Sequence, residues 1–314
     1  MIESKTLLIL GAGASVPYGY PTGLQLRKEL HDSNNLKALE NGKYHQEAYL
    51  FCQHFELSQL FSIDAFLAKR GEGQIGNSNG VISSDYQNFG TYAEFGKLAI
   101  AFCLIKRERA CHIIPTDDPR EDHWLEYLWN HMSDGPKEDF KNNQLKIISF
   151  NYDRVVERFF QTTIEHTYGT DSQEASELSK SIEIIHVYGN LQDLNEMAYG
   201  EKPEDLASVA KCIRVIPEAR NENDTQFEKA KKFIDWAEKI CFIGFGFDST
   251  NMRRLGFPNH DLSGKKIRGT VYGMKAPEVK AAENLLGAKF FNSDNYTNLK
   301  TLEYAHHLTA FCSY

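Results

Sequence analysis

Residues 145–153 read Leu-Lys-Ile-Ile-Ser-Phe-Asn-Tyr-Asp, an apolar run that closes on polar side chains. The run is short and contains two adjacent β-branched isoleucines, which is typical of a central strand in a parallel sheet. Residues 154–160 follow with apolar side chains spaced three and four apart, which predicts a helix. The polar side chains that end the strand are Ser149, Asn151 and Asp153. We therefore expect these three at the carboxyl edge of a parallel sheet, where open α/β sheets bind ligands.

The same polar side chains also have an explanation that needs no ligand. Asp153 can cap the helix that follows, and Asn151 can tolerate a tight turn. Both roles are common, so this stretch alone leaves the two explanations open. A second motif, at the amino end of the chain, favours ligand binding.

The amino end of the chain predicts a strand that runs directly into a glycine-rich turn. Residues 5–10 are Lys-Thr-Leu-Leu-Ile-Leu, and residues 11–15 are Gly-Ala-Gly-Ala-Ser. Glycines after a strand let the backbone approach a phosphate, and amides at the start of a helix bind anions. The motif is not a complete dinucleotide fingerprint, because Val16 stands where the third glycine would be.

Composition excludes several classes of protein. The chain has 314 residues, is 41% hydrophobic and carries a formal net charge of −8, with a sequence pI near 5.8. This acidic balance argues against a broad nucleic-acid-binding face. No apolar run reaches membrane-spanning length and no signal-peptide pattern is present, so we expect a cytoplasmic protein. The six cysteines are spread out without a C-x-x-C pair, which predicts reduced thiols and no zinc ribbon.

The order of the expected elements predicts an α/β fold. Residues 31–141 carry helical patterns, whereas strands and helices alternate from residue 142 onward. Further strands are expected at 183–188, 240–243, 267–272 and 288–291, and a last helix from about 296. We predict a single domain, 1–314, with a Rossmann-like, doubly wound, mainly parallel sheet formed by 1–30 and 142–314. Residues 31–141 are then a mostly helical insertion.

Four strand ends carry distinctive motifs. They are Gly-Ala-Gly-Ala-Ser at 11–15 with Gly-Tyr-Pro at 19–21, Asn-Tyr-Asp at 151–153, His-Val-Tyr-Gly-Asn at 186–190, and Gly-Phe-Gly at 244–246. In this order the set resembles the sirtuin (silent information regulator) superfamily. More narrowly, it is similar to the bacterial sirtuin-like NAD-consuming effectors of antiphage defence.

Two features depart from that family. Its deacetylase branch has a four-cysteine zinc module between the histidine motif and the later glycine-rich strand, and this chain has only Cys212 there, so no such zinc site can form. The family's histidine also stands directly before the glycine, where this chain has Tyr188, and His186 lies two residues earlier. Positions i and i+2 of a strand face the same side, so His186 could point into the same cleft. Which of the two carries the chemistry stays open.

The resemblance implies an NAD⁺ glycohydrolase, which cleaves NAD⁺ to nicotinamide and ADP-ribose, with NAD⁺ as substrate and no metal. The catalytic residues that it implies are Asn151, His186, Asp153 and Tyr188. The cofactor-binding residues that it implies are Gly11, Ala12, Gly13, Ala14, Ser15, Pro21, Ser149, Gly189, Gly244 and Gly246.

Each implied residue type suits a step of that chemistry. The amides of Gly13, Ala14 and Ser15 would bind the pyrophosphate at a helix start. The amide of Asn151 would orient ribose hydroxyls or the attacking water, and Asp153 would orient the nicotinamide amide or stabilise positive charge. The histidine would serve as a general base. Glycines 244 and 246 would let the adenosine half approach closely.

By the same resemblance we expect a role in abortive antiphage defence. We also expect a homo-oligomer, or work with a partner such as a HerA-type ATPase, and neither membrane association nor direct nucleic-acid binding. One alternative is a non-catalytic NAD- or ADP-ribose-binding subunit, in which Tyr188 marks a lost base. A second is a protein deacylase, against which the missing zinc cysteines count.

Overall fold

The computed structural model describes residues 1–39, 44–75, 90–113, 123–215, 224–257, 259–286 and 296–297. The chain forms two compact units. The first comprises Met1–Gly19, Cys111–Val187 and Asn223–Tyr314, and the second comprises Tyr20–Ala110 and Tyr188–Glu222. The predicted division into a core and an insertion at 31–141 stays a prediction.

The first unit is built on one sheet of six parallel strands in the order β3-β2-β1-β4-β5-β6. The strands are β1 (Thr6–Leu10), β2 (Leu145–Ser149), β3 (Glu183–His186), β4 (Lys239–Ile243), β5 (Lys266–Thr270) and β6 (Tyr296–Thr297). This is the order of Rossmann-type sheets, so the predicted Rossmann-like, doubly wound α/β fold is confirmed.

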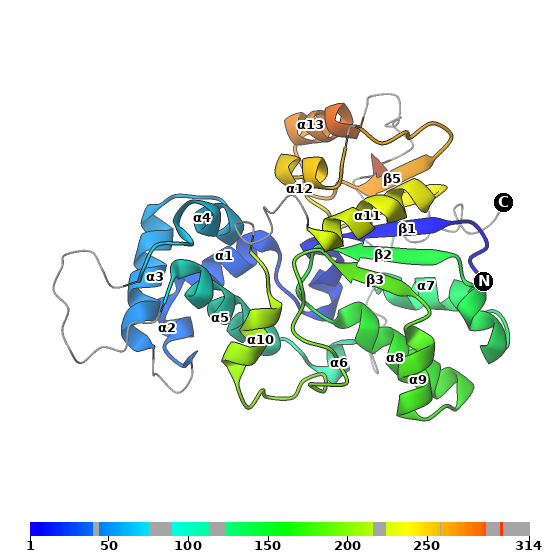
Figure 1. Ribbon diagram of the computed structural model, residues 1–314, viewed down its shortest axis with the longest axis horizontal. Coiled ribbons are helices and arrows are strands. Elements are labelled where there is room, and N and C mark those ends of the chain that lie inside the picture. Colours follow the sequence, from blue (N-terminus) through cyan, green and yellow to red (C-terminus); the bar gives the residue numbers. More distant parts are fainter. Residues whose placement is uncertain are drawn as a thin grey trace. The chain divides into compact units, whose positions relative to one another are not determined.

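Helices cover both sides of this sheet. They are η1 (Ala12–Tyr18), α6 (Ala110–Ile113), α7 (Trp124–Met132), η3 (Lys137–Asn142), α8 (Val155–Tyr168), α9 (Ser172–Ser179), α11 (Thr225–Trp236), α12 (Ser249–Arg254) and α13 (Ala276–Leu286). In Figure 1, α8 and α9 lie below β3, α11 runs between β1 and β5, and α13 lies above β5. Because both faces are covered, β1 and β4 are mostly apolar, and every residue of these two strands is buried.

The strand order places a switch point between β1 and β4. The chain moves outward in one direction from β1 through β2 to β3, and in the other direction from β4 through β5 to β6. Ligands of open α/β sheets bind outside the carboxyl ends of the strands at such a point. The turns that follow β1, β2 and β4 therefore decide what the sheet can bind.

Two of the predicted elements differ in the structure. The third strand was expected to span 183–188, but β3 ends at His186 and the chain turns there, so strand alternation does not extend to Tyr188. A short strand, β6, stands at 296–297, where the sequence predicted the start of a helix. The expected strand at 288–291 lies outside the described residues.

The second unit is helical in the part that the structure describes. Its helices are α1 (Gly23–His31), α2 (Ser33–Leu36), α3 (His45–Leu57), α4 (Ile63–Arg70), α5 (Tyr92–Ile105) and α10 (Leu206–Cys212). Helix α5 is central, since it contacts α1, α3, α4 and α10. An aromatic cluster fills the core of the unit: Phe51, Phe55, Phe66, Tyr92 and Phe95.

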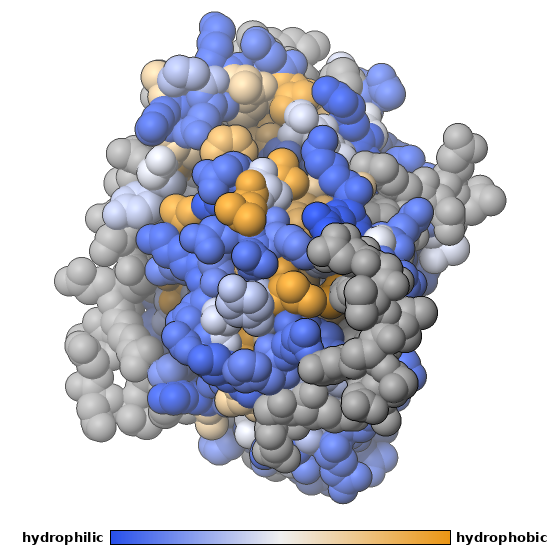
Figure 2. Space-filling view, turned by 90° about the vertical axis from the view of Figure 1, so that its left-hand side faces the viewer, coloured by the Kyte–Doolittle hydropathy of each residue, from blue (hydrophilic) through white to orange (hydrophobic). Residues whose placement is uncertain are grey.

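Figure 2 shows a mostly hydrophilic face that is interrupted by apolar side chains. In the second unit the largest exposed fractions of apolar side chains belong to Phe61, at 91%, and Leu57, at 71%. Single exposed apolar side chains of this kind are normal on protein surfaces. Among the described residues, no helix combines the length and hydrophobicity needed to cross a membrane.

Candidate active site

The glycine-rich turn after β1 packs directly on the turn after β4. Gly11 N–H donates to Ile243 O at 3.0 Å, and Gly13 N–H donates to Gly244 O at 3.0 Å. A Cβ atom on Gly11 would lie 2.5 Å from Gly244 O, and one on Gly13 would lie 2.7 Å from Gly244 Cα. Gly244 itself adopts φ +58°, a left-handed conformation that favours glycine. These three glycines therefore let two backbone turns touch at the switch point.

The expected pyrophosphate site on the amides of Gly13, Ala14 and Ser15 is wrong in part. The amide of Gly13 donates to Gly244 O, and the amide of Ala14 donates to Gly11 O at 2.9 Å, so both are already paired within the protein. The element that follows is the 3-10 helix η1, which begins at Ala12, and not the long helix of a dinucleotide fingerprint. Two of the three amides assigned to the pyrophosphate are thus already bonded: Gly13 to the turn after β4, and Ala14 within its own turn.

Asn151 ties the turn after β2 to the turn after β1. Its Nδ2 atom donates to Gly11 O and to Ser15 Oγ, both at 3.0 Å. The Ser15 hydroxyl in turn donates to the Asp153 carboxylate. Ser149 supports the start of this turn, because its Oγ accepts from the Asn151 amide at 3.1 Å. Hydrogen bonds thus connect Asn151 through Ser15 to the accepting carboxylate of Asp153.

Asp153 is a buried carboxylate at the end of this chain. It exposes 7% of its surface, and burial raises its pKa from 3.8 to about 6 although the hydrogen bonds from Ser15 and the Val155 amide oppose the shift. Its Oδ1 atom accepts from that Val155 amide at 3.2 Å, so it binds the first turn of α8, although Arg154 and not Asp153 stands at the N-cap of that helix. A carboxylate has about four lone-pair sites, and these two bonds leave acceptor capacity for a ligand.

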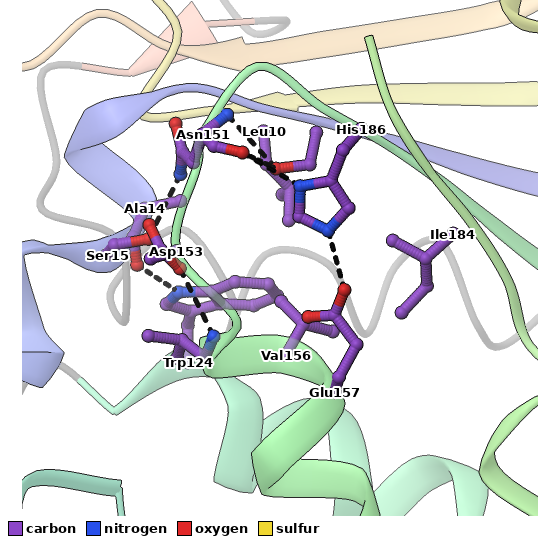
Figure 3. A pocket seen from close by; sticks show the side chains of 12 residues that line it. Leu10, Ala14, Ser15, Trp124, Asn151, Asp153, Val156, Glu157, Ile184 and His186 are labelled. Atoms are coloured by element: carbon purple, nitrogen blue, oxygen red, sulfur yellow. Dashed lines mark hydrogen bonds and ion pairs between the residues drawn. The ribbon is translucent and has the colours of Figure 1, made fainter. Parts of the chain in front are cut away.

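His186, at the end of β3, is held at both ring nitrogens. Nδ1 lies 2.8 Å from the Asn151 carbonyl oxygen, and Nε2 lies 2.5 Å from Glu157 Oε1. Burial alone lowers the pKa of the imidazole, but the Glu157 carboxylate, the Asn151 carbonyl and Asp153 together outweigh it and raise the pKa to about 8. Figure 3 shows His186 between the Asn151 turn and the first turn of α8, which carries Glu157.

These groups line one small pocket at the carboxyl edge of the sheet, with an enclosed space of about 10 Å³ (Figure 3). The polar side chains that line it belong to Ser15, Ser149, Asn151, Asp153, Glu157 and His186. The apolar ones belong to Leu10, Ala14, Trp124, Val155, Val156 and Ile184. Trp124 also fixes the turn after β1, since its Nε1–H donates to Ala14 O at 2.8 Å.

The structure brings together only part of the predicted site. Of the predicted residues, the pocket contains Ala14, Ser15, Ser149, Asn151, Asp153 and His186. Gly11, Ala12, Gly13 and Gly244 form the adjoining backbone turns, and a Cβ atom on Gly246 would meet nothing within 4 Å. Pro21, Tyr188 and Gly189 belong to the second unit. Gly189 has φ +74° and bridges to Ile213, which gives it a role within that unit.

Six pocket residues were not predicted from the sequence, and two of them, Glu157 and Trp124, make side-chain hydrogen bonds there. Glu157 stands in the first turn of α8, directly after the polar end of β2, and this place in the sequence was an available signal. Trp124 comes from α7, far from the strand ends in sequence, and only the tertiary fold brings it to them. Among the described residues, no cluster of three or more His, Cys, Asp or Glu side chains could hold a metal ion.

Comparison with known proteins adds little to this geometry. No protein-family model matches the chain, and no curated protein matches its sequence. A solved structure described as "The Structural basis for Sirtuin Substrate affinity" matches with a TM-score of 0.38 and 12% identity, over 98% of this chain and 92% of that one. A similarity at this level says nothing about the activity of the chain.

Proposed function

We propose that the protein is an NAD⁺ glycohydrolase that cleaves NAD⁺ at this pocket. The observation that carries the proposal is the buried Asp153 carboxylate, held by Ser15 beside Asn151 at the carboxyl edge of β2. The ordered strand-end motifs and the Rossmann-type strand order support a nucleotide substrate.

Hydrolysis needs a group that stabilises positive charge and a group that accepts a proton. The bond between the nicotinamide nitrogen and the ribose carbon breaks, and its electron pair neutralises the pyridinium ring. Water bonds to the ribose carbon and loses one proton. Asp153 serves both needs, because its ionised form faces the developing oxocarbenium charge and its pKa of about 6 suits it to accept the proton near neutrality.

Asn151 is proposed to orient the ribose or the attacking water. Both protons of its side-chain amide are used within the protein, by Gly11 O and Ser15 Oγ, so its side-chain oxygen is the atom that would accept from a ligand hydroxyl. The enclosed space in this pocket is about 10 Å³, room for about one water molecule, so the nicotinamide–ribose end of NAD⁺ would enter only once the lining side chains move apart. The planar nicotinamide ring would then lie against Trp124.

A second candidate is a subunit that binds NAD⁺ or ADP-ribose without turnover. The observation that favours it is that both ring nitrogens of His186 are already bonded, which leaves the predicted histidine base without a lone pair. Under this candidate the pocket retains its binding groups and lacks a productive base.

Nicotinamide release by the purified protein separates the two candidates. The hydrolase predicts release by the wild type and a loss of roughly 10²–10⁴-fold in Asp153→Asn, because that change removes the proton acceptor and keeps the shape. Calorimetry with NAD⁺ and with ADP-ribose gives the second readout. Binding without release by the wild type would support the non-catalytic subunit, and neither binding nor release would refute both.

The biological setting that we propose follows from the sequence resemblance. NAD⁺ depletion would serve abortive antiphage defence, with activity controlled by self-association or by a partner such as a HerA-type ATPase. Light scattering of the purified protein, alone and mixed with the product of the neighbouring gene, tests this proposal. A monomer that shows no change in mass or in nicotinamide release on mixing would contradict it.

A further inference from the structure

The hydrogen bonds of His186 define its protonation. Nδ1 lies 2.8 Å from the backbone carbonyl oxygen of Asn151, and a carbonyl only accepts, so Nδ1 carries a proton. Nε2 lies 2.5 Å from Glu157 Oε1, and an ionised carboxylate also only accepts, so Nε2 carries a proton as well. The ring is thus an imidazolium cation with both protons engaged.

Such a ring cannot take a proton from a substrate hydroxyl or from water. What it does instead is hold the backbone of Asn151, whose side chain joins Gly11 to Ser15. His186 exposes 9% of its side chain and Glu157 exposes 24%, so the pair is largely shielded from solvent. This geometry suits a pair that fixes the turn containing Asn151 and Asp153.

We propose that His186 and Glu157 form a positioning pair: Glu157 keeps the ring protonated, the ring fixes the Asn151 turn, and Asp153 alone accepts the proton. The inference rests on the proposed glycohydrolase for its kinetic consequence. The protonation of the ring and its dependence on Glu157 do not rest on that activity.

The proposal fixes the sign of the pH dependence. The ionisable groups that act on His186 are Glu157 from α8 and Asp153 from the turn after β2, and both favour the charged ring against the opposing effect of burial. Activity must rise as Asp153 loses its proton, near pH 6, and fall as His186 loses its proton, near pH 8. A histidine base predicts the opposite for the second step, because activity would rise as the ring loses its proton.

The test pairs a titration of the ring with a pH profile. NMR of protein with labelled histidine rings follows each imidazole, and Glu157→Gln identifies the resonance of His186, because a glutamine oxygen still accepts from Nε2 but carries no charge. We expect this change to lower the pKa of the ring by roughly one unit or more, as the loss of an adjacent opposite charge does. The alkaline limb of nicotinamide release should move to lower pH by the same amount.

A matched control is available in the same unit. His260 is also held between a carboxylate and a carbonyl, with Nδ1 2.8 Å from Asp235 Oδ1 and Nε2 2.6 Å from Leu255 O. Neither His260 nor Asp235 lines the pocket. Asp235→Asn should leave both the titration of His186 and the pH profile of nicotinamide release unchanged.

The outcomes separate this proposal from the function on which it rests. A ring that titrates below its ordinary pKa, or nicotinamide release that rises through the pKa of the ring, would overturn the positioning pair while the glycohydrolase stands. A ring that titrates high and falls in Glu157→Gln, in a protein that never releases nicotinamide, would keep the pair and overturn the glycohydrolase. A pH-independent loss of release in Glu157→Gln would show a merely structural role and would also overturn the proposal.

Discussion

Gly244→Ala tests how the two backbone turns meet at the switch point. Gly244 has φ +58°, and an added Cβ would overlap the Ala14 nitrogen, which is backbone and cannot swing aside. The left-handed conformation alone costs a non-glycine residue about 1–2 kcal/mol. Displacing the turn also breaks the hydrogen bond from Gly13 N–H to Gly244 O, worth about 0.5–1.5 kcal/mol. We expect a total loss of about 2–3 kcal/mol in the free energy of unfolding.

Gly246→Ala is the matched control, since it changes the same turn by the same methyl group. Nothing lies within 4 Å of a Cβ atom there. In a domain of this size each kcal/mol shifts Tm by about 2–4 °C, so calorimetry should show a drop of about 4–12 °C for Gly244→Ala and almost none for Gly246→Ala. Equal Tm values for the two variants would refute the argument that the glycine at 244 is required for contact between the turns.

Three further predictions concern the pocket. Asn151→Ala removes two buried hydrogen bonds and should lower the unfolding free energy by about 2–3 kcal/mol in denaturant titration; an unchanged midpoint would contradict this. Trp124→Phe leaves the Ala14 carbonyl oxygen without its donor and should cost about 1–2 kcal/mol, checked by the same titration. The folded pKa of Asp153 lies above its unfolded value, so the ionised carboxylate weakens the fold as pH rises through about 6. Asp153→Asn should therefore raise Tm near pH 8 and leave it almost unchanged near pH 4; a Tm difference from wild type that does not change with pH would refute the assigned pKa.

The fold was predictable because its signals are local. The β-branched run in 145–149 and the apolar run in 6–10 identify parallel strands from sequence alone, and the polar residues that end them mark the carboxyl edge. The strand order was not predictable in detail, since nothing local states that β1 lies between β2 and β4. It is this order that brings the turn after β4 against the glycines of the turn after β1.

The candidate site was predictable only where its residues sit at strand ends. Asn151, Asp153 and His186 were identified in this way, and they meet because β2 and β3 pair in parallel, with Ser149 opposite His186. The hydrogen-bond partners of these residues were not identified, because they depend on which helix packs beside the strand ends. Glu157 is bonded to Nε2 of His186, and this contact changes the chemistry that the histidine can perform.

The glycine-rich turn after β1 was identified from the sequence, but its neighbour was not. A glycine-rich turn after a strand predicts close approach of something to the backbone, but not what approaches. Here the close neighbour is the turn at Gly244, which accepts from the Gly13 amide. The same glycine pattern serves a ligand in one fold and a second turn in another, so only the structure distinguishes them.

The most direct test of the central claim measures NAD⁺, nicotinamide and ADP-ribose together in one reaction of the purified protein near pH 7. We expect equal yields of the two products from the wild type and from Asp235→Asn, and a loss of at least about 10²-fold in Asp153→Asn. Wild-type protein that leaves NAD⁺ intact, or an Asp153→Asn variant that hydrolyses it at the wild-type rate, would contradict the claim that this pocket cleaves NAD⁺.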